Sequence, residues 1–254
     1  MSLLEALFLG IIQGITEFFP ISSSGHLILF QKLLGLDHLE KYVFFDLVCH
    51  LGTLFAVLWI FAGEIKKAFS EKSYFFQVVI GTLPLFPMVF LLHPLKSLFN
   101  KIEYLGYFFL LTSVLLYFGE RFRMRLSSDK RSFRDAIGIG CFQALAILPG
   151  VSRSGSTISG AKLLGWKTED AIAFSFLLSV PAILGGIVLE AKEAFFGDSP
   201  VYFEANAYLA GFAAAFFTGF IALKCLIRIA ARDKFKIFSW YCAGIGFLTL
   251  YLFH

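Results

Sequence analysis

The chain has 254 residues, of which 58% are hydrophobic and only 16% are charged, and phenylalanine alone contributes 33 residues. The core of a soluble protein cannot absorb so much apolar side chain, so this composition excludes an ordinary soluble domain and favours a membrane protein. The formal net charge of +4 is small. The placement of charge along the chain is therefore more informative than its sum.

Ten apolar stretches follow one another, and we expect each to be helical because lipid offers no partner to an unpaired backbone group. Six of them are close to the length that crosses a bilayer. The other four form two pairs, 3–35 and 135–166, each interrupted near its middle by Pro, Gly and Ser. The limits of the stretches are 3–19, 22–35, 43–62, 75–93, 104–118, 135–148, 155–166, 170–190, 205–227 and 235–253.

Each interrupted pair is predicted to be a re-entrant helical hairpin. Broken backbone at membrane depth has to be buried in protein or to line a wet cavity. Two short tilted spans are the alternative. The two hairpins are also copies, because a shift of 130 residues places "QGITEFFPISSSG" (13–25) on "QALAILPGVSRSG" (143–155) without a gap, so that Gly25 meets Gly155.

The predicted fold is therefore an all-α polytopic membrane domain over 1–254, made of two repeats at about 1–120 and 134–254. Each repeat holds one re-entrant hairpin and three transmembrane helices. Three crossings bring the chain to the opposite side, so the repeats should have inverted topology, with their broken segments meeting near the midplane. Most loop Lys and Arg residues, including the run from Arg121 to Arg134, fall on one face. The positive-inside rule makes that face cytoplasmic, and both termini are then expected outside.

The first hairpin carries a polar cluster at a depth where polar groups are expensive. Gln13 and Glu17 are four residues apart and share one helix face. Pro20 ends that helix, the serines that begin at Ser22 can cap the next one, and His26 lies in its first turn. A functional site is the default interpretation of such a cluster.

The second hairpin breaks at Pro149–Gly150, and Ser152, Arg153, Ser154 and Thr157 surround the next helix start. A helix N-terminus offers free N–H groups and a positive dipole end, which suit an anion. Arg153 adds a fixed charge and a bidentate fork that matches phosphate. Two such helix ends meeting head to head predict a strong anion site.

Other polar residues are expected to play supporting parts. Asp46 and His50 form another i, i+4 pair and should support the site from outside it, and Asp135 either does the same or caps its helix. Lys162 and Glu190 are predicted to be end-of-helix charges that reach toward the membrane interface.

Three motifs carry a family resemblance: "QGITEFFPISSSGHL" (13–27), "FDLVCHLGTLFAV" (45–57) and "DAIGIGCFQALAILPGVSRSGSTI" (135–158). With them the chain resembles the bacterial undecaprenyl-diphosphate phosphatase family of the bacitracin-resistance type. The resemblance implies a multi-pass enzyme of the bacterial cell membrane that hydrolyses undecaprenyl diphosphate to the monophosphate and inorganic phosphate. It also implies a divalent cation, Mg²⁺ or Ca²⁺, with no organic cofactor and no nucleic-acid partner. Neither the resemblance nor the sequence indicates an oligomeric state.

The family's functional positions are carried over onto matching residues. The predicted catalytic set is Glu17, Ser23, His26 and Arg153, and the predicted substrate-binding set is Gln13, Ser22, Ser152, Ser154 and Thr157. Glu17, with Gln13, is expected either to hold the cation or to act as base. Many family members have Glu at the first of these positions, whereas this chain has Gln13. The nucleophile stays open, because Ser23 or His26 could attack phosphorus, or His26 could activate Ser23 or water.

Three other functions are weighed against this one. Inverted repeats with broken helices are also typical of transporters, so a transporter or flippase for a phosphorylated lipid or anion is the main alternative. Such a carrier has no need for Glu17, Ser23 and His26 beside Arg153. A structural scaffold would leave Arg153 unexplained. Lipid phosphatases of the acid-phosphatase type need a histidine six residues after the arginine, where this chain has Ser159.

Overall fold

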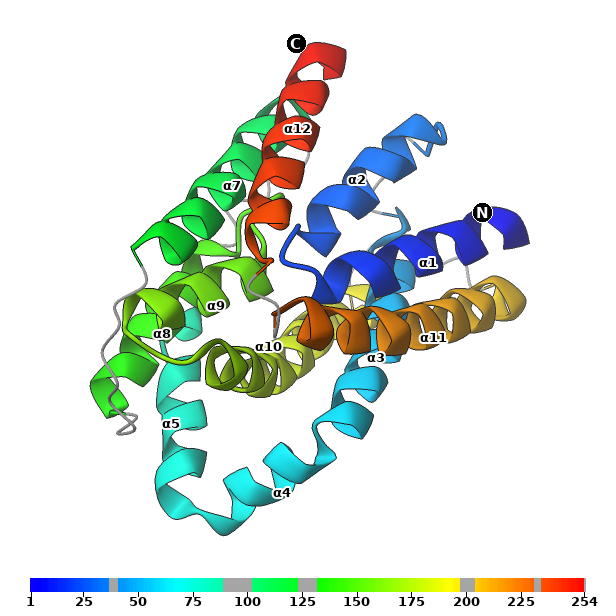
Figure 1. Ribbon diagram of the computed structural model, residues 1–254. Helices are drawn as coiled ribbons and strands as arrows, with labels where there is room; N and C mark the ends of the chain where they lie inside the picture. Colours follow the sequence, from blue (N-terminus) through cyan, green and yellow to red (C-terminus); the bar gives the residue numbers. More distant parts are fainter. Residues whose placement is uncertain (37–40, 89–101, 123–131, 197–203, 231–233, 254) are drawn as a thin grey trace.

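The computed structural model of the chain is all-helical in the part that it describes, which comprises residues 1–36, 41–88, 102–122, 132–196, 204–230 and 234–253 (Figure 1). Its elements are α1 (Leu3–Phe18), α2 (Ser23–Leu33), α3 (Val43–Ile60), α4 (Ala62–Ser70), α5 (Lys72–Thr82), the 3-10 helix η2 (Ile102–Tyr104), α7 (Leu105–Arg121), α8 (Phe133–Leu145), α9 (Arg153–Leu163), α10 (Thr168–Phe196), α11 (Ala205–Ala230) and α12 (Lys236–Phe253). The helical prediction is confirmed. Eight of the ten apolar stretches begin and end within a few residues of a helix, and a ninth, 170–190, lies inside α10, which runs on to Phe196.

Five helices of the described residues are long and apolar enough to cross a membrane, namely α3, η2 with α7, the part of α10 up to Leu189, α11 and α12. The predicted single helix over 75–93 is wrong, because α5 ends at Thr82 and a turn follows at Leu83 and Pro84. Proline lacks the N–H that would continue the helix. Residues 89–93 of that prediction lie outside the described residues. The amphipathic helix α4 was not expected.

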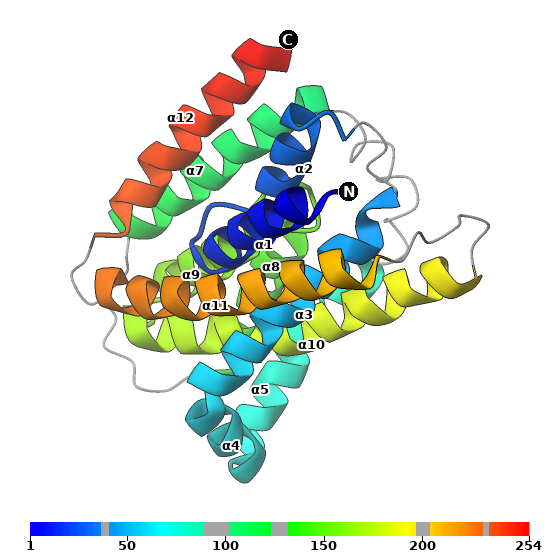
Figure 2. The ribbon, with the colours of Figure 1, turned by 90° about the vertical axis from the view of Figure 1, so that its right-hand side faces the viewer.

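Small residues bring the long helices close together. The helix α1 packs along α11, which also packs on α3, and α7 pairs with α12 (Figures 1 and 2). A Cβ atom on Gly10 would lie 2.5 Å from the carbonyl oxygen of Gly211, so only glycine permits this approach of α1 to α11. Such contacts hold membrane helices together without a hydrophobic driving force between them.

The two interrupted pairs form helical hairpins, α1–α2 and α8–α9, and their turns meet at the centre of the molecule (Figure 1). A Cβ atom on Gly25 would lie 2.9 Å from Gly150 Cα, and one on Gly155 would lie 3.2 Å from the carbonyl oxygen of Pro20. These two contacts are related by the 130-residue shift. The turns are therefore packed backbone to backbone, which leaves no room for lipid between them.

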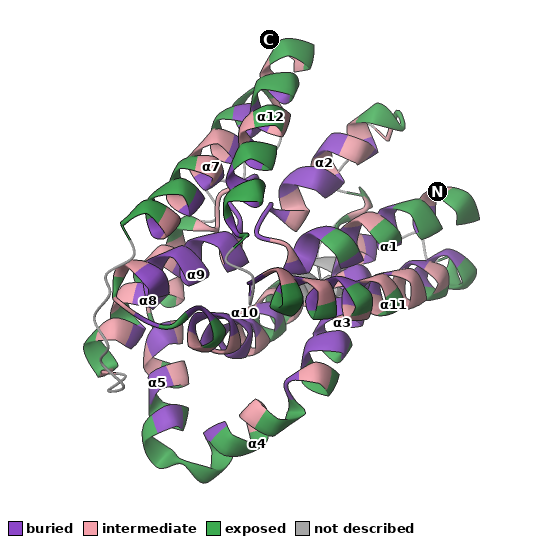
Figure 3. Ribbon diagram, in the orientation of Figure 1, coloured by how far each residue is buried: buried purple, intermediate pink, exposed green. Residues whose placement is uncertain are grey.

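A second pair of contacts obeys the same shift. The Thr112 hydroxyl donates to the Gly150 carbonyl oxygen at 2.8 Å, and the Cys242 thiol donates to the Pro20 carbonyl oxygen at 3.8 Å. The helices α7 and α12 thus each hold the turn of one hairpin. Buried positions concentrate around these turns and along α9 and α10, while outer faces of α4 and α12 are exposed (Figure 3). Trp240 on α12 is 74% exposed, as expected for a side chain that faces lipid.

Lys162 does not reach toward the interface, and that prediction is wrong. Its side chain is 2% exposed, forms an ion pair with Glu120 of α7, and lies with Nζ 5.0 Å from the centre of the Phe235 ring. The pair ties the C-terminal ends of α7 and α9 together. A buried charge needs such a partner because burial removes its hydration by water, and only the attraction of an opposite charge can offset that cost. The side chain of Glu190 lies outside the described residues.

We expect Lys162→Met to lower the free energy of unfolding by about 3–5 kcal/mol, because Glu120 would be left as a buried, unpaired charge. The double variant Lys162→Met with Glu120→Leu should recover most of that loss. Thermal unfolding in detergent measures both. A single variant as stable as the wild type, or a double variant less stable than the single, would contradict a buried ion pair.

Candidate active site

Glu17, in the last turn of α1, is the centre of the polar cluster. Its side chain is 5% exposed, and Oε2 accepts hydrogen bonds from Ser23 Oγ at 2.6 Å and from Gln13 Nε2 at 3.1 Å. His50 Nε2 lies 3.6 Å from the same oxygen, and Oε1 pairs with Arg153 Nη2. Side chains from α1, α2, α3 and α9 therefore converge on one carboxylate.

Arg153 is the first residue of α9 and reaches Glu17 across the meeting point of the two hairpins. Its side chain is 17% exposed. Although Nη2 is paired, the Nη1 atom is buried and has no hydrogen-bond partner among the described residues. A buried donor without a partner is rare in proteins and requires an explanation. The guanidinium thus presents one free arm at the centre of the molecule.

The two helices that start here also present free backbone donors. Ser22 caps α2 by accepting from the Gly25 N–H at 3.3 Å, and Ser152 caps α9 by accepting from the Gly155 N–H at 3.0 Å. Within the described part of the chain, the N–H groups of Ser23 and Arg153, the first residues of the two helices, contact no acceptor. Each helix start therefore adds positive potential to the centre.

No hydrogen bond or ion pair joins His26 to Glu17 or Ser23 in the described structure. Its Nδ1 lies 2.7 Å from the Ser22 carbonyl oxygen, and its Nε2 lies 2.8 Å from the hydroxyl of Tyr241 on α12. The ring is 1% exposed and stacks on Tyr241 at 5.7 Å between centroids. The imidazole that faces Glu17 is that of His50, a residue predicted from the sequence to support the site.

The comparisons with known proteins show the family of the chain. The model of the bacitracin resistance protein BacA family matches residues 6–248. The chain belongs to the BacA family. An undecaprenyl-diphosphatase of Protochlamydia amoebophila is 48% identical over 100% of this chain and 99% of its own length. One of Carboxydothermus hydrogenoformans is 40% identical over 99% and 98%, and one of Methanosphaera stadtmanae is 34% identical over 99% and 98%.

In this BacA family chain, the other predicted site hydroxyls, those of Ser152, Ser154 and Thr157, form hydrogen bonds mainly within the second hairpin. Ser152 Oγ and Ser154 Oγ lie 3.3 Å apart. Thr157 Oγ1 donates to the Arg153 carbonyl oxygen at 2.8 Å and lies 2.6 Å from Ser175 Oγ of α10. These groups therefore fix the backbone from which Arg153 extends, and Thr157 joins α9 to α10.

The supporting residues divide into two groups. The Asp46 carbonyl oxygen accepts from His50 Nδ1 at 2.7 Å and thereby turns His50 Nε2 toward Glu17. Asp135 lies elsewhere, in a capping box with Ser132 at the start of α8, where it also accepts from Trp166 Nε1. The helix-cap interpretation of Asp135 is confirmed.

Two residues outside the set predicted from the sequence, Thr112 and Tyr241, contact the site. Thr112 Oγ1 accepts from the Ser152 N–H at 3.0 Å while donating to Gly150, so it holds the second turn at two points. Tyr241 contacts His26. Both lie within apolar runs, where a single hydroxyl group does not indicate from the sequence that it contacts a site.

The oxygen atoms beside Glu17 fit a hard divalent cation. Gln13 Oε1 is buried and has no hydrogen-bond partner within the described part of the chain, and its amide nitrogen already bonds Glu17. An amide oxygen and one carboxylate, completed by phosphate oxygens, form the kind of ligand set that Mg²⁺ or Ca²⁺ takes. In the described residues no three His, Cys, Asp or Glu side chains gather as a metal site, so the substrate would have to supply ligands.

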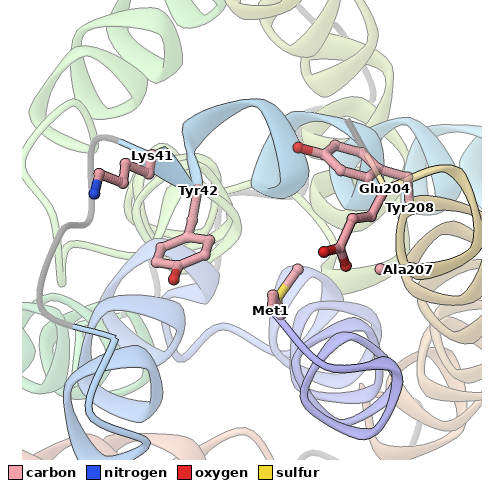
Figure 4. A pocket seen from close by; sticks show the side chains of 6 residues that line it. All are labelled: Met1, Lys41, Tyr42, Glu204, Ala207 and Tyr208. Atoms are coloured by element: carbon pink, nitrogen blue, oxygen red, sulfur yellow. The ribbon is translucent and has the colours of Figure 1, made fainter. Parts of the chain in front are cut away.

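A separate pocket of about 300 Å³ opens where the chain start meets the beginnings of α3 and α11 (Figure 4). It is lined by Met1, Lys41, Tyr42, Glu204, Ala207 and Tyr208. None of these residues contacts the Glu17 cluster in the described structure, so we place the active site at the meeting of the hairpins.

Proposed function

We propose that this chain hydrolyses undecaprenyl diphosphate to undecaprenyl phosphate and inorganic phosphate, recycling the lipid carrier of peptidoglycan synthesis and conferring bacitracin resistance. The observation that carries the proposal is the free Nη1 arm of Arg153 beside the first, unpaired N–H groups of two helices and the Glu17–Ser23 pair. The names of the relatives support the same reaction. A polyprenyl diphosphate is a lipid whose head group matches this concentration of positive charge.

The diphosphate is held by the second hairpin. Arg153 donates through Nη1 to a phosphate oxygen while Nη2 stays on Glu17, and the free N–H groups of the helix starts add further donors. Ser22, Ser152, Ser154 and Thr157 keep these donors in place. Fixed donors stabilise charge that develops on phosphoryl oxygens, which supplies most of the catalysis in phosphoryl transfer.

Ser23 is the nucleophile and Glu17 its base. As Ser23 Oγ forms a bond to the terminal phosphorus, its proton passes to Glu17 Oε2, 2.6 Å away. The bond from that phosphorus to the bridging oxygen breaks, and undecaprenyl phosphate leaves. Water then cleaves the phosphoserine, Ser23 recovers its proton from Glu17, and inorganic phosphate is released.

Glu17 and Gln13 Oε1 are the residues that would hold a divalent cation, Mg²⁺ or Ca²⁺, with the substrate supplying further oxygen ligands. Such a cation would supply positive charge that neutralises the diphosphate. Gln13 then serves in two ways, since its Nε2 fixes Glu17 and its Oε1 remains available. His50, oriented by Asp46, completes the surroundings of Glu17.

The chain is a single domain of the bacterial cell membrane, built from inverted repeats of about 1–120 and 134–254, with re-entrant hairpins and the termini outside. The contacts related by the 130-residue shift support the repeat. The loop charges support the orientation. The head group enters from outside, and the lipid tail lies along the apolar outer surface, which exposes side chains such as Phe55 and Phe217.

The test is phosphate release from a C55 diphosphate lipid by the purified protein in detergent, with Mg²⁺ or Ca²⁺ and with a chelator. Wild type should release phosphate. Ser23→Ala should lower kcat about 10³-fold or more, because the attacking atom is lost. The matched control Ser24→Ala, one residue along the same helix turn, should stay within threefold.

The competing function predicts another result. A wild-type protein that releases no phosphate but moves the lipid or phosphate across liposomes would identify a flippase or transporter. Equal activity of Ser23→Ala and wild type would instead leave the phosphatase function standing and remove Ser23 as the nucleophile.

A further inference from the structure

His26 is held by hydrogen bonds on both sides of its ring, and chemistry sets the direction of each. The Ser22 carbonyl oxygen can only accept, so the proton lies on Nδ1 of His26. In the neutral ring Nε2 is then an acceptor, and the Tyr241 hydroxyl donates to it at 2.8 Å. Tyr241 and His26 are 215 residues apart in sequence, so this bond joins the last helix to the first hairpin.

The backbone at Ser22, whose carbonyl oxygen accepts from His26, is strained. Ser22 has φ of 72°, and among the described residues it is the only non-glycine residue with a positive φ. Such a conformation persists only where surrounding contacts enforce it. The Ser22 carbonyl accepts from both Nδ1 and the backbone N–H of His26, at 2.7 and 3.2 Å. The residue that follows this peptide is Ser23, whose hydroxyl lies on Glu17.

Tyr241 lies on the face of α12 that packs against the first hairpin's turn. Phe238, three residues earlier, contacts Phe19 with ring centroids 5.2 Å apart, and Cys242 donates to the Pro20 carbonyl oxygen. These neighbours keep α12 at a constant distance from the turn. The Tyr241 hydroxyl can therefore hold the His26 ring in one orientation.

We propose that Tyr241 is a positioning residue, which acts through His26 to hold the strained Ser22 peptide and so aims Ser23 at Glu17. The proposal rests on the phosphatase function given above. It places the effect of Tyr241 on the turnover step, because neither ring contacts Arg153 in the described structure. His26 then acts on the nucleophile Ser23 through the neighbouring Ser22 backbone.

The kinetic test is a double-mutant cycle. Tyr241→Phe keeps the ring and loses the hydroxyl, so kcat should fall about tenfold with KM within twofold. In a His26→Ala background the same substitution should have no further effect. His26→Asn, whose amide can still donate to Ser22, should be more active than His26→Ala. The control is Tyr251→Phe, at a residue of α12 that is itself 85% exposed, and it should match wild type.

An unchanged kcat in Tyr241→Phe, or an equal loss with and without His26, would overturn the proposal. The same holds if His26→Asn is as inactive as His26→Ala, since His26 would then act on the substrate itself.

A spectroscopic readout separates this proposal from the function on which it rests. Side-chain ¹⁵N NMR in detergent, assigned with His26→Asn, should show His26 as the Nδ1–H tautomer with Nε2 hydrogen-bonded. Tyr241→Phe should move only the Nε2 resonance, and an unmoved resonance would overturn the proposed bond. A wild type that shows this resonance but releases no phosphate would overturn the phosphatase function instead.

Discussion

Arg153→Ala is expected to lower kcat/KM for the C55 diphosphate by about 10³-fold or more. The substitution removes the donor arm that is free for phosphate and leaves the buried carboxylate of Glu17 without its cationic partner. Loss of a single fixed donor to a developing charge typically slows a reaction 10²- to about 10³-fold. Here a charge and a fork of donors disappear together. Phosphate release over a range of lipid concentrations measures the effect.

Arg153→Lys separates charge from geometry. Lysine keeps the positive charge, but its ammonium cannot span Glu17 and a phosphate oxygen as the planar guanidinium does. We expect an activity between those of wild type and Arg153→Ala. The surface control Arg121→Ala should stay within twofold of wild type, since Arg121 is exposed at the end of α7. Full activity of Arg153→Ala would show that the phosphate binds elsewhere.

Glu17→Gln should lower kcat by about 10³-fold, within the range usual for loss of a general base. The amide has the size of the carboxylate, so packing at this buried position is retained, but it cannot take the Ser23 proton. It also releases Arg153 for the substrate, so KM should not rise when the divalent cation is saturating. This split between kcat and KM distinguishes loss of the base from loss of binding.

The matched control is Glu5→Gln at the other end of the same helix. Glu5 belongs to the capping box of α1 with Ser2, far along the chain from the site. Its substitution should cost a little helix stability and leave kcat unchanged. If Glu17→Gln raised KM and left kcat intact, Glu17 would be a binding residue, and Ser23 would need another base.

Most helices and the breaks of the two hairpins could be predicted because local chemistry determines them, whereas the break at Leu83–Pro84 was missed. An apolar run in lipid has to satisfy its backbone internally. Pro20 and Pro149 lack an N–H donor and lie in the turns that follow α1 and α8, where Gly150 adopts φ of 93°. The 130-residue shift placed Arg153 in register with Ser23. Both residues are now found on Glu17.

Contacts between distant residues followed from packing, which no local pattern encodes. The sequence presents two histidines near the site, and the orientation of α12 decides that His26 faces Tyr241 while α3 brings His50 to Glu17. Lys162 looked like an end-of-helix charge, yet α7 brings Glu120 to it and buries both. Composition and periodicity determine which segments are helices in lipid. The side chain that meets a given polar group depends on how those helices cross, because neighbours across a helix interface can lie more than a hundred residues apart.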